Sequence, residues 1–278
     1  MPPDSLAIVT FDGAQIAYRR VGKGRPLVVL NGFGATNADW DPSFIDRLAS
    51  SNELILLDNR GIGGSTDDGQ AFEIAKLADD AAHVMDAIGM ERASVMGWSM
   101  GGFIAQAFAV NYADRVDKLV LLSTDPGGSE ADLASADVWS QLLDTSGTPN
   151  EQARRLFFVL FPTDVAESLY RQFGDIVAAA RAQLSIDVLH RQAAAMDAWH
   201  HNGVASQLRE IDVPVLIASG REDVVIPASN ALKLVKTIPG AWLAQFPHGG
   251  HAFMAQYPRA LADLINNFFA LDELDSRL

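Results

Sequence analysis

One serine lies in a pattern that is typical of a nucleophile. Gly97-Trp98-Ser99-Met100-Gly101-Gly102 follows an apolar run at 93–96 and opens a helical pattern. A serine between a strand and a helix, with small residues around it, sits on a tight turn that raises its hydroxyl above the edge of a sheet. The N-terminus of the helix favours negative charge developing nearby. The pattern predicts Ser99 as a nucleophile, with the backbone N–H of Met100 facing the developing oxyanion. The alternative is a glycine-rich turn with an incidental serine.

A serine hydroxyl needs a neighbouring base at neutral pH, and the chain holds six histidines. In patterns of this kind the acid and then the histidine follow the serine, which favours the late pair His248 and His251. Gly249 and Gly250 precede His251, so its loop can bend toward the serine. We predict His251 as the base and keep His248 as the alternative.

The imidazole needs a carboxylate that holds its tautomer and stabilises its cation. Asp223 follows the apolar run 213–218 and precedes a helical pattern. It would lie in a loop at the carboxyl end of a strand, where sites collect in sheets of this type. We predict Asp223 as the acid. Glu222, its neighbour, and Asp125, after another strand, remain alternatives.

An oxyanion needs a second donor, which we expect from the loop Leu30-Asn31-Gly32-Phe33-Gly34. Its glycines allow the backbone to approach a substrate, and the N–H of Phe33 is the natural donor. The alternative is a plain turn between a strand and a helix. The glycine-rich stretch at 58–65 lacks the spacing of a phosphate loop. We interpret it as structural, with Asp58 and Arg60 bracing the loops.

Strands and helices alternate around these residues. Asp12-Gly13 between two apolar runs predicts a hairpin, and the later apolar runs do not alternate, which favours strands buried on both faces of a parallel sheet. We expect strands over 6–11, 14–21, 26–30, 54–57, 93–96, 116–122, 213–218 and 241–246. Helices are expected over 73–88, 100–111, 227–237 and 258–270. This order predicts a doubly wound, mostly parallel, eight-stranded α/β sheet.

The alternation breaks between residues 127 and 212, where we expect no strand. Helical patterns rich in Ala and Leu occupy 131–143, 150–161, 164–186 and 188–200. We therefore predict a sheet domain in two parts, 1–126 and 213–278, with a helical lid inserted at 127–212. A separate helical domain is the alternative.

Composition limits the function classes. The 278 residues include 21 Lys and Arg against 35 Asp and Glu, a formal charge of −14, which argues against nucleic acid as a partner. The chain has no cysteine, so disulfides, thiolate metal sites and a cysteine nucleophile are excluded. The sequence shows neither a basic leader nor an apolar run of spanning length, which predicts a soluble cytoplasmic protein without a membrane partner. Its oligomeric state stays open.

These ordered blocks resemble the α/β-hydrolase family, and in particular its small serine esterases with a helical lid. The resemblance rests on Asn31–Gly34, Asp58–Ser65, Gly97–Gly102 and the late Asp223 with Gly250-His251. It implies Ser99 as nucleophile, Asp223 as acid, His251 as base, an acyl-enzyme intermediate and no cofactor. Asn31 stands where many members have a histidine. Serine at position 99 argues against those branches of the family whose nucleophile is a carboxylate.

We expect hydrolysis of a carboxylic ester, thioester or lactone. The same triad could cleave a carbon–carbon bond or run cofactor-free perhydrolysis, as the family's non-haem haloperoxidases do. A cofactor-free oxygenase or lyase, or a ligand receptor without catalysis, is less expected. Aromatic side chains favour a small, uncharged or aromatic organic substrate, and the candidates to contact it are Phe33, Trp98, Trp139, Phe161, Trp199 and Phe253.

Overall fold

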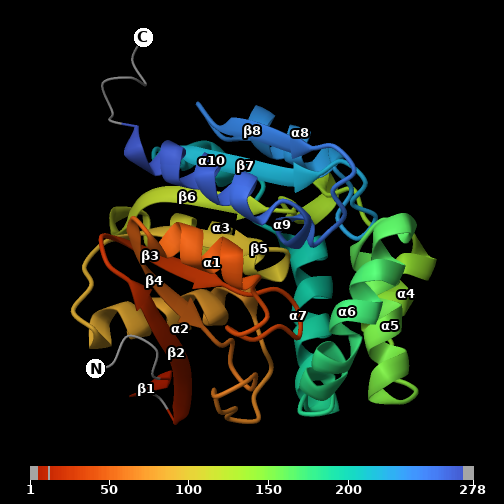
Figure 1. Cartoon of the computed structure of the whole chain (residues 1–278). Helices are drawn as coiled ribbons and strands as arrows, with labels where there is room; N and C mark the ends of the chain where they lie inside the picture. Colours follow the sequence, from red (N-terminus) through yellow and green to blue (C-terminus); the bar gives the residue numbers. More distant parts are fainter. Residues whose placement is uncertain (1–5, 12, 272–278) are drawn as a thin grey trace.

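A single mostly parallel sheet organises the molecule (Figure 1). The computed structural model describes residues 6–11 and 13–271, and within them eight strands pair in the order β1-β2-β4-β3-β5-β6-β7-β8. The strands are β1 Leu6–Phe11, β2 Ala14–Gly22, β3 Arg25–Leu30, β4 Asn52–Leu57, β5 Ala93–Trp98, β6 Val116–Leu122, β7 Val215–Gly220 and β8 Trp242–Phe246. β2 is antiparallel to both β1 and β4, and the other pairs are parallel. The expected fold class is confirmed.

The first two strands form the expected hairpin. Phe11 pairs with Ala14 across the turn, and Gly13 adopts a φ of 76°, which glycine tolerates. Exposed residues alternate along β1, as in an edge strand with one solvated face, whereas every residue of β7 is buried. The continuous apolar run of β8 is the exception: it predicts a strand buried on both faces, but β8 lies at the other edge of the sheet and none of its residues is fully buried.

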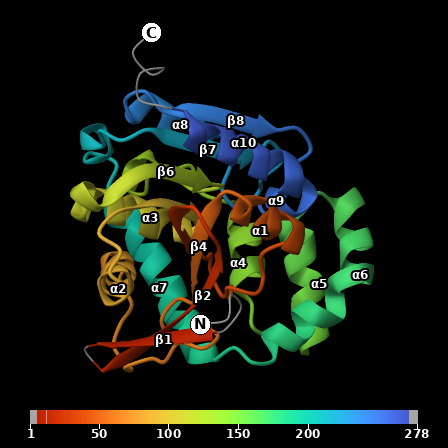
Figure 2. The same ribbon diagram turned by 60° about the vertical axis from the view of Figure 1, so that its left-hand side comes forward.

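Helices cover both faces of the sheet, as Figure 2 shows. Phe44 and Leu48 of α1 pack with Leu261 and Ile265 of α10 against one face. The helices α2, α3 and α8 contribute to a second apolar cluster on the other face. The bounds are α1 Pro42–Ala49, α2 Ile74–Ala87, α3 Met100–Asn111, α8 Ser229–Thr237, α9 Phe253–Gln256 and α10 Pro258–Ala270, with 3-10 turns at Ala113–Arg115, Gly128–Glu130 and Leu208–Glu210.

Four helices separate β6 from β7 in the sequence, although these two strands pair directly. They are α4 Ala136–Leu143, α5 Pro149–Leu160, α6 Thr163–Arg181 and α7 Ile186–Asn202, here called the α4–α7 segment. Residues 127–212 contain no strand, as expected. In Figures 1 and 2, α4, α5 and α6 stand together beyond one end of the sheet, while α7 runs back toward α2 and α3. Among the described residues, no helix combines the length and apolarity needed to cross a membrane.

Some helix boundaries differ from those expected. The pattern over 164–186 predicts one continuous helix, yet α6 ends at Arg181. The hydroxyl of Ser185 accepts a hydrogen bond from Val188 N and caps α7 instead. Likewise Ser135 caps α4, so residues 131–135 are not helical. The short helices α1 and α9 were not among the expected elements.

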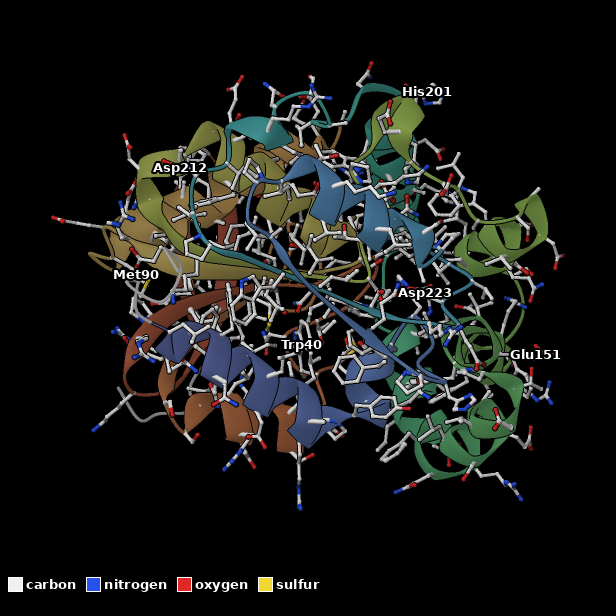
Figure 3. All side chains as sticks on the ribbon, turned by 90° about the horizontal axis from the view of Figure 1, so that it is seen from above. Trp40, Met90, Glu151, His201, Asp212 and Asp223 are labelled. Carbon is white, nitrogen blue, oxygen red and sulfur yellow. The ribbon has the colours of Figure 1, made fainter. Side chains whose placement is uncertain are left out.

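The topology gathers the chemically interesting residues at one edge of the sheet. Ser99, Asp223 and His251 follow β5, β7 and β8, and the loop containing Phe33 follows β3. All four strands are parallel, so their carboxyl ends meet at the same edge. In Figure 3, Asp223 lies toward the green helices, whereas Met90 and Asp212 lie at the opposite end of the sheet.

Candidate active site

The turn between β5 and α3 holds Ser99 in a backbone conformation that few side chains adopt. Its φ is 57°, and its carbonyl accepts a hydrogen bond from Gly102 N at 2.8 Å. A β-carbon on Gly97 would lie 2.0 Å from the carbonyl oxygen of Gly101. One on Gly101 would lie 2.2 Å from the carbonyl oxygen of Leu30. The turn is therefore closed to side chains on both flanks, as the small residues around Ser99 predict.

His251 connects Ser99 to Asp223. Its Nε2 lies 2.8 Å from Ser99 Oγ, and its Nδ1 lies 2.9 Å from one carboxylate oxygen of Asp223 and 3.1 Å from the other. A proton on Nδ1 facing the carboxylate leaves Nε2 free to accept from the serine hydroxyl. The His251 and Asp223 side chains are buried at 2% and 0% exposure. The amides of Val225 and Ile226 also donate to Asp223 Oδ1, at 2.9 and 2.8 Å, which fixes the carboxylate.

The alternative histidine and acids have other partners. His248 Nδ1 lies 2.7 Å from Glu222 Oε1 in an exposed pair. Asp125 accepts from Trp199 Nε1 at 3.2 Å and lies 3.3 Å from His200 Nε2. None of these side chains makes a hydrogen bond to Ser99 or His251 among the residues that the structure describes.

Two backbone N–H groups beside Ser99 have no acceptor within the described part of the chain. They belong to Met100, the first residue of α3, and to Phe33, after β3. The loop that carries Phe33 lies close to the serine, since a β-carbon on Gly32 would be 3.2 Å from Ser99 Cβ. Unpaired N–H groups at such a turn can receive a developing negative charge.

Asn31 holds this loop in place. Its Nδ2 donates to the carbonyl of Leu57 at 2.5 Å, and its Oδ1 accepts from Trp40 Nε1 at 2.6 Å. Its own carbonyl accepts from Asn59 Nδ2 at 3.0 Å. Asparagine therefore provides the bracing at this position.

The stretch after β4 braces the same edge, as expected. Asp58 accepts from the amides of Asn37 at 2.6 Å and Gly64 at 2.9 Å. Burial nevertheless raises the pKa of the Asp58 carboxyl above its usual value. Arg60 is buried at 1% exposure and pairs with Asp80 through two hydrogen bonds of 3.0 and 2.5 Å. Asp58 ties neighbouring loops together, and Arg60 ties its loop to α2, so both residues have a structural task.

Two of the six aromatic candidates flank Ser99 directly. Trp98 donates from Nε1 to the carbonyl of His251 at 3.0 Å, and the two rings lie 5.5 Å apart. Trp98 therefore supports the loop that carries the histidine. Phe33 is partly buried against the core beside Ser99.

The other four aromatic candidates lie deeper or farther out. Phe253 is fully buried and packs on Phe246 at 5.1 Å. Phe161 stacks on Phe157 at 5.8 Å. Trp199 stacks on Phe103, and Trp139 lies at the edge of His200. Trp139 lines a cavity of about 320 Å³ with Asp125, Asp132, Leu133, Ala134, Ala136, Asp197, His200, His201 and Val225.

Sequence reasoning missed two residues of the α4–α7 segment that reach the loop after β3. Gln192 Oε1 accepts from the amide of Gly34 at 2.9 Å. A β-carbon on Gly34 would lie 3.3 Å from Arg181 Nη1. Their separation from Gly34 exceeds 140 residues, and no short-range pattern marks them. Among the described residues, no cluster of three or more His, Asp or Glu could hold a metal ion.

The site and its fold match a known family of hydrolases. Residues 25–256 match the profile described as the alpha/beta hydrolase fold. The chain belongs to the α/β-hydrolase family. This membership agrees with the resemblance drawn from the ordered blocks and supports hydrolase activity at the family level.

Individual α/β-hydrolases cover almost the full length of this one. A protein named as the carbamate hydrolase RutD, from Caulobacter sp. (strain K31), is 31% identical over 88% of this chain and 91% of its own. One named as the non-heme bromoperoxidase BpoC, from Mycobacterium tuberculosis (strain ATCC 25618 / H37Rv), is 28% identical over 92% and 97%. The crystal structure of a hydrolase from Pseudomonas aeruginosa PA01 superposes with a TM-score of 0.80 at 27% identity, covering 96% and 99%.

Proposed function

We propose that this α/β-hydrolase cleaves a carboxylic ester, thioester or lactone through an acyl-enzyme on Ser99. The observation that carries the proposal is the continuous contact from Ser99 Oγ to His251 Nε2 at 2.8 Å and from His251 Nδ1 to Asp223 at 2.9 Å. Serine alone is a weak nucleophile, and this arrangement supplies its base and the group that orients the base.

The proposed reaction has two halves. Ser99 Oγ attacks the carbonyl carbon while His251 Nε2 takes the hydroxyl proton. The N–H groups of Phe33 and Met100 stabilise the oxyanion, and protonated His251 then gives its proton to the leaving group. Water, deprotonated by His251, attacks the acyl-enzyme and releases the acid. Asp223 orients the imidazole and stabilises the imidazolium in both halves.

We further propose that residues 127–212 act as a lid over this edge of the sheet. Two contacts support the idea. The carbonyl of Leu160 accepts from Ala252 N at 3.2 Å, beside His251, and Gln192 holds the amide of Gly34. A small organic substrate would lie between the lid and the edge. Aromatic contacts would come from Phe33 and Trp98 and, within the lid, from Trp139, Phe161 and Trp199, whereas Phe253 is fully buried and would only support the site.

Ser99→Ala tests the nucleophile. With 4-nitrophenyl butanoate as substrate, we expect the variant to lose roughly 10⁴- to 10⁶-fold in kcat. A fluorophosphonate probe should label Ser99 in the wild type, with the adduct located by peptide mass spectrometry. Folded wild-type protein that neither turns over esters nor accepts the probe would remove the serine-hydrolase proposal.

The same variant separates the alternatives. Carbon–carbon bond hydrolysis and perhydrolysis would also use Ser99, so a panel with a vinylogous diketone, and with acetate plus hydrogen peroxide, decides between them and ester cleavage. The names of RutD and BpoC add a carbamate and a halide oxidation assay to that panel. An oxygenase or lyase that uses His251 only as a base would keep its turnover in Ser99→Ala. Tight ligand binding without turnover in the wild type would indicate a receptor.

A further inference from the structure

A buried arginine without a counter-ion lies beside Gly34, in the loop after β3. Arg181, the last residue of α6, is only 8% exposed. Its Nε donates to Gln152 Oε1 at 3.3 Å, and within the described chain the guanidinium group makes no other hydrogen bond and no ion pair. A guanidinium group has five N–H donors, so most of its capacity is unused. In a chain with 35 acidic residues, a buried arginine without a carboxylate partner calls for an explanation.

A second donor without an acceptor belongs to Gln192, which also contacts Gly34. Gln192 is fully buried, and its Oε1 accepts from Gly34 N. Of the two polar atoms in the Gln192 side chain, only the oxygen can accept a hydrogen bond from the Gly34 N–H, so this bond fixes the orientation of the side-chain amide. Gln192 Nε2 is then left buried without an acceptor. Arg181 and Gln192 thus bring donors, and no matching acceptor, to Gly34.

The charges around Arg181 do not neutralise it. Burial lowers the pKa of its guanidinium, the positive charge of Arg155 lowers that pKa further, and the weaker effect of Asp39 opposes both. The carboxylate of Asp39 is engaged elsewhere, by Thr36 N at 2.6 Å and Thr36 Oγ1 at 2.8 Å. Uncompensated buried charge destabilises a fold, which makes a purely structural role for Arg181 a poor explanation.

The position of Arg181 relative to Ser99 suits a substrate group. Gly34, which neighbours Arg181 Nη1, and Gly32, which neighbours Ser99, are two residues apart in one loop. Their α-carbons are therefore at most about 7 Å apart. Leu184 and Leu189 also approach Gly34, so an apolar wall lies beside the charge. A short molecule could engage both ends of this loop.

We propose that Arg181, with Gln192 beside it, binds a carboxylate group of the substrate while Ser99 attacks an acyl carbon of the same molecule. The planar guanidinium can hold a carboxylate through two parallel hydrogen bonds, and the ligand would supply the acceptors that the protein lacks. This inference rests on the proposed serine-hydrolase function. The aromatic side chains favour a small, uncharged or aromatic substrate, and the present inference replaces it with an anionic one, bound by a local positive charge.

Two matched pairs of esters test the proposal. The first compares mono-4-nitrophenyl glutarate with 4-nitrophenyl hexanoate, which places the charge in the acyl part. The second compares 4-acetoxybenzoate with its methyl ester, which places it in the leaving group. In the wild type we expect kcat/KM to favour the anionic member in one pair. Arg181→Gln should reduce that preference about 10- to 100-fold, mainly through KM, with little effect on the neutral esters.

Arg171→Gln is the control, because Arg171 lies exposed on the same helix and bonds only within it, to the carbonyl of Glu167. It should keep the wild-type preference. Arg181→Lys keeps the charge but loses the planar fork, so it should restore part of the preference.

Outcomes for the two proposals are distinct. A wild type that prefers the neutral member of both pairs, or an Arg181→Gln variant with an unchanged preference, overturns the carboxylate site and leaves the Ser99 mechanism standing. If wild-type protein hydrolyses none of the four esters and does not react with the fluorophosphonate probe, the serine-hydrolase proposal fails, and the carboxylate site with it.

Discussion

Adjacent carboxylates at the end of β7 face different histidines. Asp223 contacts buried His251, whereas Glu222 contacts exposed His248. We predict that Asp223→Asn lowers kcat on 4-nitrophenyl butanoate by roughly 10³- to 10⁴-fold, because the amide cannot stabilise the imidazolium. Steady-state kinetics, with near-ultraviolet circular dichroism to verify the fold, measure this loss.

Glu222→Gln is the matched control for that substitution. It removes one charge from the neighbouring position, but its partner lies at the surface, where ion pairs contribute little. We expect activity within about twofold of the wild type. If Glu222→Gln were as damaging as Asp223→Asn, or Asp223→Asn retained full activity, the assignment of the acid would be wrong.

At the scale of elements, the turn between β5 and α3 depends on residues without side chains. We predict that Gly97→Ala unfolds or strongly destabilises the protein, by about 4 kcal/mol or more, because its β-carbon would meet the Gly101 carbonyl at 2.0 Å. Gly174→Ala serves as the control. It lies inside α6, and the three atoms nearest to an added β-carbon, at 2.7 to 3.3 Å, belong to the ring of Tyr170, a side chain that can rotate.

Chemical denaturation compares the two variants. Gly174→Ala should remain within about 1 kcal/mol of the wild type, because alanine favours a helix. A Gly97→Ala protein with wild-type stability would contradict the account of the turn.

Local patterns predicted most of the elements, and they singled out Ser99, His251 and Asp223, which the structure brings into contact. The reasons are physical and have limits. The turn around Ser99 depends on consecutive residues, so a short motif predicts it. β6 and α10 begin and end where their apolar patterns do. The end of α6 was missed because a later serine cap decides it. Arg181 and Gln192 were missed because only the packing of α6 and α7 against the loop after β3 brings them to Gly34. No periodicity encodes a contact of that range.

For the whole molecule, α7 fastens the α4–α7 segment to the rest of the fold at two points, in addition to the bond from Ala252 N to the Leu160 carbonyl. Near its C-terminal end, Trp199 Nε1 donates to Asp125, at the end of β6. Near its N-terminal end, Arg191 forms a two-pronged pair with Asp67, in the stretch between β4 and α2. Its guanidinium also lies 4.7 Å from the centre of the Phe72 ring. Two distant attachments hold the helix across the face that carries α2 and α3.

The attachment at Arg191 should depend on pH in a defined direction. The hydrogen bond from Arg191 is the main cause that lowers the pKa of the Asp67 carboxyl below its usual value of 3.8. A carboxylate with a lowered pKa stabilises the folded state above its unfolded pKa and loses that contribution as the pH falls through the folded pKa.

We predict that Arg191→Gln lowers stability at pH 7 by about 1 kcal/mol, a fall of roughly 2–4 °C in Tm. The deficit should shrink as the pH drops from 5 toward 3. Thermal unfolding followed by circular dichroism at several pH values measures it, with Arg171→Gln as a control that keeps the wild-type Tm throughout. A deficit in Arg191→Gln that stays constant down to pH 3 would assign the stabilisation to contacts that do not titrate, the packing on Phe72 and the hydrogen bond to the Gln70 carbonyl, instead of the pair with Asp67.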